Sequence, residues 1–130
     1  MPLKPHEIAY LEQADLGRLA TLQRNGTLQN SPVGFGYNAE LSTIDIAGYR
    51  MGSSQKFRNI AHHDTVAFVV DDIASRDPWR VRCLEIRGRA AQVGHGDSAL
   101  IRITPERVIS FGIDDTDTPP HELAPDIRDV

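Results

Sequence analysis

Most of the chain consists of short, strand-like segments separated by turn signals. The clearest signal is Asn25-Gly26, because both residues tolerate positive φ and the pair is typical of a tight β-hairpin. Strands that recur at this spacing, with few helices between them, indicate a closed or split β-barrel. We therefore predict a mainly β fold, a split β-barrel of six to seven strands. The expected strands span residues 18–23, 27–37, 43–49, 65–70, 79–93, 99–103 and 107–112.

Two short helices are expected beside these strands. Pro5 is typical of a first helical turn and predicts a helix over residues 5–14. A second helix is expected over residues 54–62. Residues 1–113 would form the barrel domain. Residues 114–130 are rich in Asp and Pro and poor in apolar side chains, so they are expected to form an extended acidic tail, ordered only on a partner.

Two of the expected strands contain residues that interrupt a regular ladder. Pro32 has no N–H to donate, so it predicts an edge strand, a bulge or an opening in the sheet. Gly34 and Gly36 would let a ligand approach the backbone closely. A frayed edge without a ligand is the alternative. Gly88, inside the long segment 79–93, predicts a bulge or a barrel corner.

Composition excludes several classes of protein. The 130 residues fit one domain, and a net charge of −4 without a basic face argues against a nucleic-acid partner. Cys83 is the single cysteine, so no intrachain disulfide or zinc-thiolate cluster can form. No apolar run reaches the roughly 18 residues that a membrane span needs. The first residues lack an apolar signal core, so a cytoplasmic protein is expected.

No group of residues stands out as an acid, a base or a nucleophile. His62, His63 and Asp64 are adjacent, but neighbouring side chains in an extended segment point to opposite faces, so no metal site is predicted. A serine nucleophile elbow and a complete glycine-rich dinucleotide motif are both absent from the sequence. The catalytic residues stay unknown, and any redox chemistry would belong to a bound cofactor.

The segment 52–60 is the strongest candidate for a binding site. It follows a strand and opens a helix, where small residues and unpaired backbone N–H groups favour an anion. This pattern predicts a cradle for a phosphate group. The alternative is a serine-capped surface helix whose basic residues are merely solvated. The candidate ligands are the side chains of Ser53, Ser54, Lys56, Arg58 and Asn59.

Six sequence motifs between residues 17 and 90 occur in the same order as in the pyridoxamine 5′-phosphate oxidase-like superfamily, which the chain therefore resembles. Within it they are most similar to the actinobacterial branch of small deazaflavin (coenzyme F420)-dependent reductases. The resemblance covers about residues 6–113, but the stretch after Val93 lacks the helix that many relatives insert there. The motifs lie at residues 17–22, 25–27, 31–35, 55–60, 65–70 and 85–90.

The resemblance implies a split β-barrel homodimer with two cofactor sites at the subunit interface. Lys56, Arg58 and Asn59 would hold the cofactor phosphate, preceded by Ser53 and Ser54. The other cofactor-binding residues that it implies are Ser31, Pro32, Val33 and Gly34 against the ring, Tyr49, Arg50 and Met51 along ring and tail, and Trp79 and Arg87 from the second subunit.

The implied function is an F420-dependent oxidoreductase. It would transfer a hydride between the deazaflavin coenzyme and a small, electron-poor organic acceptor. Arg50, Lys56 and Arg58 favour F420 over FMN, because F420 carries a phosphodiester and an acidic glutamyl tail whereas FMN ends in one phosphate. Two alternatives remain, an FMN-binding oxidoreductase of the same family and a non-catalytic carrier or sensor of flavin or haem. No side chain is an evident proton donor.

Overall fold

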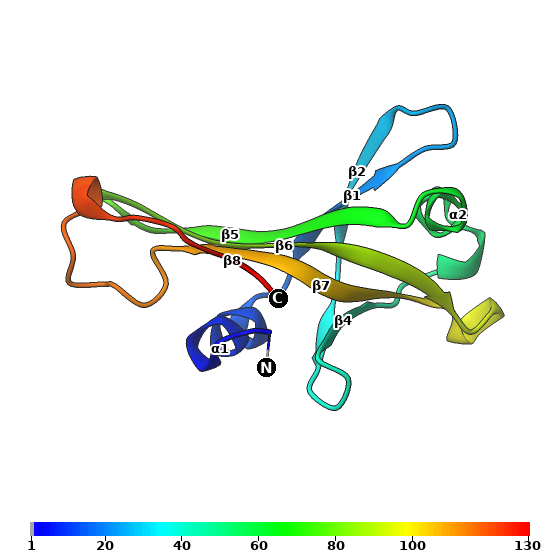
Figure 1. Cartoon of the computed structure of the whole chain (residues 1–130), viewed down its shortest axis with the longest axis horizontal. Helices are drawn as coiled ribbons and strands as arrows, with labels where there is room; N and C mark the ends of the chain where they lie inside the picture. Colours follow the sequence, from blue (N-terminus) through cyan, green and yellow to red (C-terminus); the bar gives the residue numbers. More distant parts are fainter. Residues whose placement is uncertain (1) are drawn as a thin grey trace.

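A computed structural model describes residues 2–130. Over these residues the protein is mainly β with two α-helices, as the sequence predicted, and eight strands, rather than the expected six or seven, form one antiparallel sheet (Figure 1). The elements follow in the order α1 (Pro5–Gln13), β1 (Gly17–Leu22), β2 (Leu28–Val33), β3 (Gly36–Asn38), β4 (Thr43–Ile46), η1 (Met51–Ser53), α2 (Gln55–His62), β5 (Thr65–Arg76), β6 (Trp79–Val93), η2 (Gly96–Ser98), β7 (Leu100–Phe111), η3 (Pro120–Glu122) and β8 (Asp126–Asp129).

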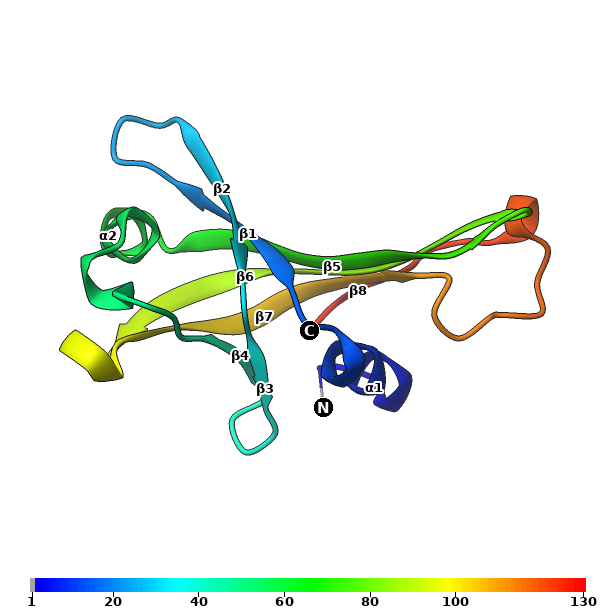
Figure 2. The same ribbon diagram turned by 180° about the vertical axis from the view of Figure 1, so that it is seen from behind.

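The strands are arranged as a split barrel. Their order across the sheet is β2-β1-β5-β6-β7-β4-β3, and β8 pairs with the far half of β7. The two ends of this order, β2 and β3, are consecutive in the chain and joined only by Gly34 and Phe35. No ladder joins β2 to β3 within residues 2–130, so the barrel stays open along that seam. In Figure 2, β2 lies above strands β5 to β7 and β3 lies below them, and the chain passes directly from one to the other.

The hairpin of β5 and β6 is longer than the sequence indicated. The predicted strands ended at residue 70 and began again at residue 79, but β5 continues to Arg76 and the chain turns only at Asp77-Pro78. The prediction was wrong because this part of the hairpin leaves the barrel. There, polar side chains pair across the strands, as Asp72 and Arg82 do, instead of packing in a core.

Gly88 marks a bulge, as predicted. The register between β6 and β7 shifts between Arg87 and Gly88. A Cβ atom on Gly88 would lie 2.1 Å from the carbonyl oxygen of Thr104, so only glycine fits. On the other side of β7, β4 pairs as far as Ile103 and β8 starts at Arg107. Pro105 lies in the gap between these partners, where its missing N–H costs nothing.

Three further boundaries differ from the predicted ones. The segment 27–37 is divided into β2 and β3, because the chain leaves one end of the sheet and joins the other at Gly34. β4 ends at Ile46 instead of residue 49. The segments 99–103 and 107–112 form one strand, β7, because a bulge accommodates the interruption at Pro105.

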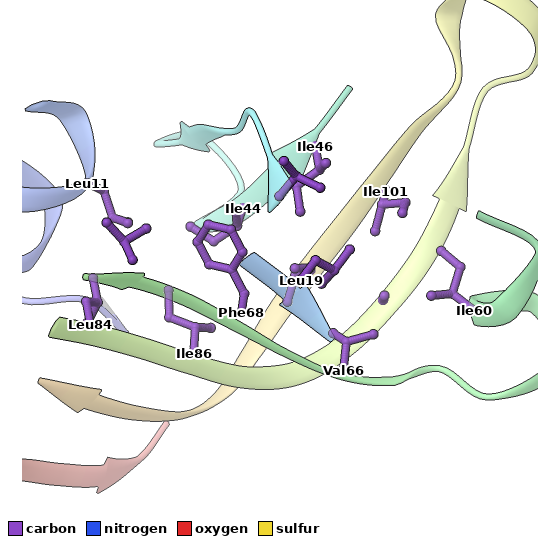
Figure 3. Packing of buried hydrophobic residues seen from close by; sticks show 14 of the residues in the cluster. Leu11, Leu19, Ile44, Ile46, Ile60, Val66, Phe68, Leu84, Ile86 and Ile101 are labelled. Carbon is purple, nitrogen blue, oxygen red and sulfur yellow. The ribbon is translucent and has the colours of Figure 1, made fainter. Parts of the chain in front are cut away.

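The core fills the barrel with branched apolar side chains. Leu19 from β1, Ile44 from β4 and Phe68 from β5 point toward one another (Figure 3). The Phe35 ring, at the open seam, packs edge-on against Phe68 with ring centroids 5.1 Å apart. Ile60 extends the same cluster from α2 and fixes the helix on the barrel. The core therefore determines where the start of α2 lies.

The two ends of the chain meet in a cluster that we call the terminal clamp, formed by Lys4, Glu7, Asp126 and Arg128. The Glu7 carboxylate is fully buried and accepts hydrogen bonds from the Arg128 guanidinium and, at 2.8 Å, from the Lys4 amide. Arg128 also donates to the carbonyl of Pro2, at 2.7 Å, and the Lys4 ammonium pairs with Asp126. Burial alone would raise the pKa of Glu7, but these contacts hold it below its ordinary value.

The last residues are therefore more ordered than predicted. The expected extended tail forms η3 and β8, and β8 pairs with β7 from Arg107 to Ser110. The composition of these residues was misleading, because β8 is held by the buried ion pair of Glu7 and Arg128 and by pairing with the edge of β7. It has few apolar side chains of its own. Within residues 2–130, none of the helices has the length and apolar character needed to cross a membrane.

Candidate functional site

The start of α2 has the geometry of an anion site. Ser54 is the N-cap, and its hydroxyl accepts a hydrogen bond from the Phe57 amide at 3.3 Å and donates one to the Met51 carbonyl at 2.7 Å. The amides of Gln55 and Lys56 have no partner within the described residues. Ser54 therefore serves the helix itself, and two free N–H groups remain to face a ligand.

Three basic residues lie close in the chain to these free amides, in the turn before α2 and in its first two turns. The Arg58 guanidinium folds back over the turn and donates to the Ser53 carbonyl at 2.6 Å and to Gln55 Oε1 at 2.9 Å. Lys56 occupies the second position of the helix. Arg50 precedes η1 with φ of 55°, in the left-handed region that few non-glycine residues adopt. We call Arg50, Lys56, Arg58 and the free N–H groups of Gln55 and Lys56 the cradle.

The cations of the cradle differ from most others in this chain. Eight of the fourteen Lys and Arg side chains lie within 4.0 Å of a carboxylate, but Arg50, Lys56 and Arg58 do not, within the part of the chain that the structure describes. No acidic residue occurs between Asp45 and Asp64. The paired cations are Lys4, Arg18, Arg82, Arg87, Arg89, Arg102, Arg107 and Arg128.

Asn59 lies in the cradle's helix but does not face a ligand. It is 1% exposed, and its amide donates to Thr21 Oγ1 at 3.0 Å and to Gln29 Oε1 at 2.9 Å. Its oxygen accepts from Gln55 at 2.7 Å. All these bonds are internal, so Asn59 positions α2 against β1 and β2 instead of binding a phosphate directly. Gln29 and Gln55, which complete this network, were not among the predicted residues. The polar alternation of β2 was the only sequence signal for Gln29.

The predicted ring-binding residues lie on an edge strand, as Pro32 indicated. β2 pairs with β1 on one side only, so the backbone of Ser31, Pro32 and Val33 borders the open seam. The Val33 side chain itself is buried in the core, so only its backbone is available. Gln29 links this edge to the cradle, because it donates to Ser31 Oγ at 3.3 Å and accepts from the Asn59 amide.

The three residues after β4 have different environments. Tyr49 is 98% exposed and Arg50 is also exposed, whereas Met51 is buried in the core. Met51 therefore anchors the turn, and Tyr49 and Arg50 are presented to solvent. Ser53 is exposed too, with its hydroxyl donating to the Arg50 carbonyl at 3.2 Å.

Two predicted residues lie away from the cradle. Trp79 starts β6, while Gln92, near the other end of that strand, donates to the Phe57 carbonyl of α2. Gln92 lies thirteen positions after Trp79 along the extended strand, a distance of roughly 40 Å at the usual rise. Arg87 lies midway and pairs with Glu85 at 2.9 Å, which raises the pKa of Arg87. Neither side chain reaches the cradle of its own chain.

The arrangement suits binding better than acid–base chemistry. No cluster of His, Cys, Asp or Glu that could hold a metal ion occurs in the described residues. Burial raises the pKa of the Cys83 thiol, and nearby Asp71 adds to that shift, so the thiol is a poor nucleophile at neutral pH. In contrast, the cradle supplies unpaired cations and free N–H groups at a helix start, which fit a phosphate group.

Comparison with known proteins identifies the family of the chain. Residues 3–111 match the family described as pyridoxamine 5′-phosphate oxidase. A 5a,11a-dehydrotetracycline/5a,11a-dehydrooxytetracycline reductase from Streptomyces rimosus is 43% identical over 122 residues, which cover 88% of this chain and 86% of that protein. The expected class of activity, an oxidoreductase, is confirmed by this relative.

Solved structures share the fold. A conserved hypothetical protein, Rv2991 from Mycobacterium tuberculosis, superposes with a TM-score of 0.72 at 17% identity, covering 90% of this chain and 89% of that one. A protein described as an F420 reductase gives a TM-score of 0.57 at 22% identity, covering 75% of this chain and 90% of that one. By fold and by sequence, the chain belongs to the pyridoxamine 5′-phosphate oxidase family.

Proposed function

We propose that this protein is a coenzyme F420-dependent reductase that passes a hydride to a small, electron-poor organic acceptor. The observation that carries the proposal is the cradle. Among residues 2–130, Arg50, Lys56 and Arg58 have no carboxylate within 4.0 Å, whereas most of the other cations are paired. Cations without an internal carboxylate partner are available for charge-assisted hydrogen bonds to an anionic ligand.

The chain's own residues would bind and orient the cofactor. Lys56 and Arg58, with the N–H groups of Gln55 and Lys56, would hold the phosphate through charge-assisted hydrogen bonds. The edge backbone of Ser31 to Gly34 would lie against the ring and could donate to charge that develops there. A bound deazaflavin would supply the hydride. Since neither a carboxylic acid nor a histidine belongs to the cradle as the structure describes it, solvent would supply the proton.

Charge supports F420 over FMN. FMN ends in a single phosphate, for which Lys56, Arg58 and the free N–H groups are sufficient. Arg50 adds a third unpaired cation at the side of η1, beyond the helix start. F420 continues past its phosphodiester into an acidic tail, which gives Arg50 a partner that FMN lacks.

The relative from Streptomyces rimosus supports the class of acceptor. Its name describes reduction of a dehydro compound, that is, of a carbon–carbon double bond in a conjugated polycyclic molecule. We propose an acceptor of this class, an electron-poor double bond in a rigid ring system, for the present protein.

We also propose that the working unit is a homodimer. One chain leaves the cradle and the edge of β2 open to solvent, and Trp79 is 56% exposed at the far end of β6. A second copy would cover the ring and could bring its own Trp79 and Arg87 to the site. Light scattering should give a dimer, and Trp79→Ala should weaken cofactor binding without changing the dimer. A monomer that binds the cofactor tightly would contradict this assembly.

Turnover tests the proposal directly. The purified protein is supplied with reduced F420 or with FMN and NADPH, and a panel of enones, quinones and dehydrotetracyclines is added. Oxidation of reduced F420 that depends on an acceptor is expected, and it should be lost in Lys56→Ala but kept in Lys4→Ala, a matched cation in the terminal clamp. Turnover with FMN and NADPH, but not with reduced F420, would identify FMN as the cofactor. Cofactor binding without turnover would favour a carrier.

A further inference from the structure

A hollow of about 460 Å³ lies beside the cradle, between the short helices η1 and η2. Its walls come from two separate turns of the chain. Gly48, Tyr49 and Arg50 precede η1, while Gly96 and Asp97 belong to η2, the connection between β6 and β7. Neither Gly96 nor Asp97 has a role in the phosphate site described above.

The hollow and β2 lie on opposite sides of α2. β2 is fastened to the helix through the bond from Asn59 to Gln29, at 2.9 Å. η2 instead packs on η1, where a Cβ atom on Gly52 would be 3.4 Å from the amide nitrogen of Gly96. Figures 1 and 2 both show the β1–β2 hairpin on one side of α2 and η2 on the other. A ligand with its ring along β2 and its phosphate in the cradle would extend any further group toward the hollow.

The two walls carry opposite charges. Arg50 continues the positive side of the cradle, and Asp97 stands on the facing turn. Neither has an oppositely charged partner within 4.0 Å in the region covered by the structure. The Asp97 turn is braced by the Ser98 hydroxyl, which donates to the His95 carbonyl at 2.9 Å, and by Gly96 with φ of 58°. An acidic group that enters the hollow therefore meets an attracting charge on the wall of Arg50 and a repelling charge on the wall of Asp97.

We infer that the hollow receives the acidic tail of F420 and that Asp97 is a specificity-determining residue that limits how many glutamates the tail can carry. The inference rests on the proposed function, since only a cofactor that continues past its phosphate would reach the hollow. Arg50 attracts the first tail carboxylate, and like-charge repulsion from Asp97 disfavours longer tails. The enzyme would then prefer F420 with a short tail.

Binding of F420 forms that differ only in tail length tests this. Dissociation constants are measured by fluorescence titration for forms with none, two and five glutamates, at low and at physiological salt. In the natural sequence, each glutamate beyond the first should weaken binding by about two- to fivefold at low salt, and salt should reduce the difference. Asp97→Asn should abolish this dependence, and Asp97→Lys should reverse it.

Asp117→Asn is the matched control, because Asp117 is an exposed acid in the loop before η3, at the other end of the molecule. It removes the same charge and should leave the dependence on tail length intact. Equal affinity for all tail lengths in the natural sequence, or an unchanged dependence in Asp97→Asn, would overturn the inference alone. Failure of every F420 form to bind, with FMN bound normally, would overturn the proposed function and this inference together.

Discussion

In the terminal clamp, Arg128 and Lys4 each lie against a carboxylate, whereas in the cradle Arg50 and Lys56 have none within the described residues. Arg128 has a structural role, because it neutralises the buried Glu7 and connects β8 to the first residues of the chain. The cradle cations sit on a helix that the core already fixes. The presence or absence of a carboxylate partner, and not the residue type, therefore distinguishes a structural cation from one that is available to a ligand.

The largest expected effect belongs to the clamp. Arg128→Met leaves the Glu7 carboxylate buried without its partner, which typically costs about 3–5 kcal/mol in free energy of unfolding. Urea denaturation measures that loss, and Glu7→Leu/Arg128→Met should recover most of it because both charges are then gone. Cofactor affinity of the molecules that remain folded should not change. A loss of affinity with normal stability would show that the clamp is part of the site.

The cradle should show the opposite pattern. Lys56→Ala and Arg58→Ala should each weaken cofactor binding by about 1.5–3 kcal/mol, the range for hydrogen bonds to charged groups. Stability should change by no more than about 0.5 kcal/mol in Lys56→Ala and by about 1 kcal/mol in Arg58→Ala, which loses its hydrogen bonds to Ser53 and Gln55. Calorimetric titration and urea denaturation of the same samples give both numbers. Unchanged binding in both variants would rule out the cradle as the phosphate site.

Substitution of Asn59 distinguishes a structural role from ligand binding within α2. Asn59→Ala removes an amide that bridges Thr21, Gln29 and Gln55, so we expect a loss of about 1–2 kcal/mol in stability. Affinity should fall less than in Lys56→Ala, because Asn59 is buried and acts only by holding α2 in place. An affinity loss as large as that of Lys56→Ala, with normal stability, would instead support direct contact with the phosphate.

We expect the smallest effect from a change of pH, which tests the terminal clamp without a substitution. Burial would raise the pKa of Glu7, but hydrogen bonds from Arg128 and the Lys4 amide bring it below the ordinary 4.5. A carboxyl whose folded pKa is depressed adds stability above its unfolded pKa and loses it as pH falls through the folded one. Stability should therefore drop below about pH 4.5 more steeply than in Glu7→Gln. Parallel urea midpoints of both proteins between pH 7 and 3 would contradict this.

The regular parts of the fold could be predicted from the sequence. The Asn25-Gly26 hairpin, the bulge at Gly88 and the edge position of Pro32 were each indicated by residues whose backbone chemistry allows few alternatives. The order of β8 could not be predicted, because it depends on an ion pair between residues 7 and 128. A contact across the whole chain leaves no local pattern.

The candidate site was predictable only in part. Lys56 and Arg58 were identified because a basic helix start after small residues is a local signal. Asn59 shares that segment, yet its environment is decided by Gln29, thirty residues earlier, and so its structural role was missed. The absence of acids around Arg50 could be seen in the sequence. That its charge stays unpaired could be seen only in three dimensions.

A crystal structure of the protein with F420 bound tests the central claim most directly. We expect phosphate density within hydrogen-bonding distance of Lys56, Arg58 and the Gln55 amide, with the ring along β2. Cofactor density elsewhere on the protein, with the start of α2 left to solvent, would contradict it.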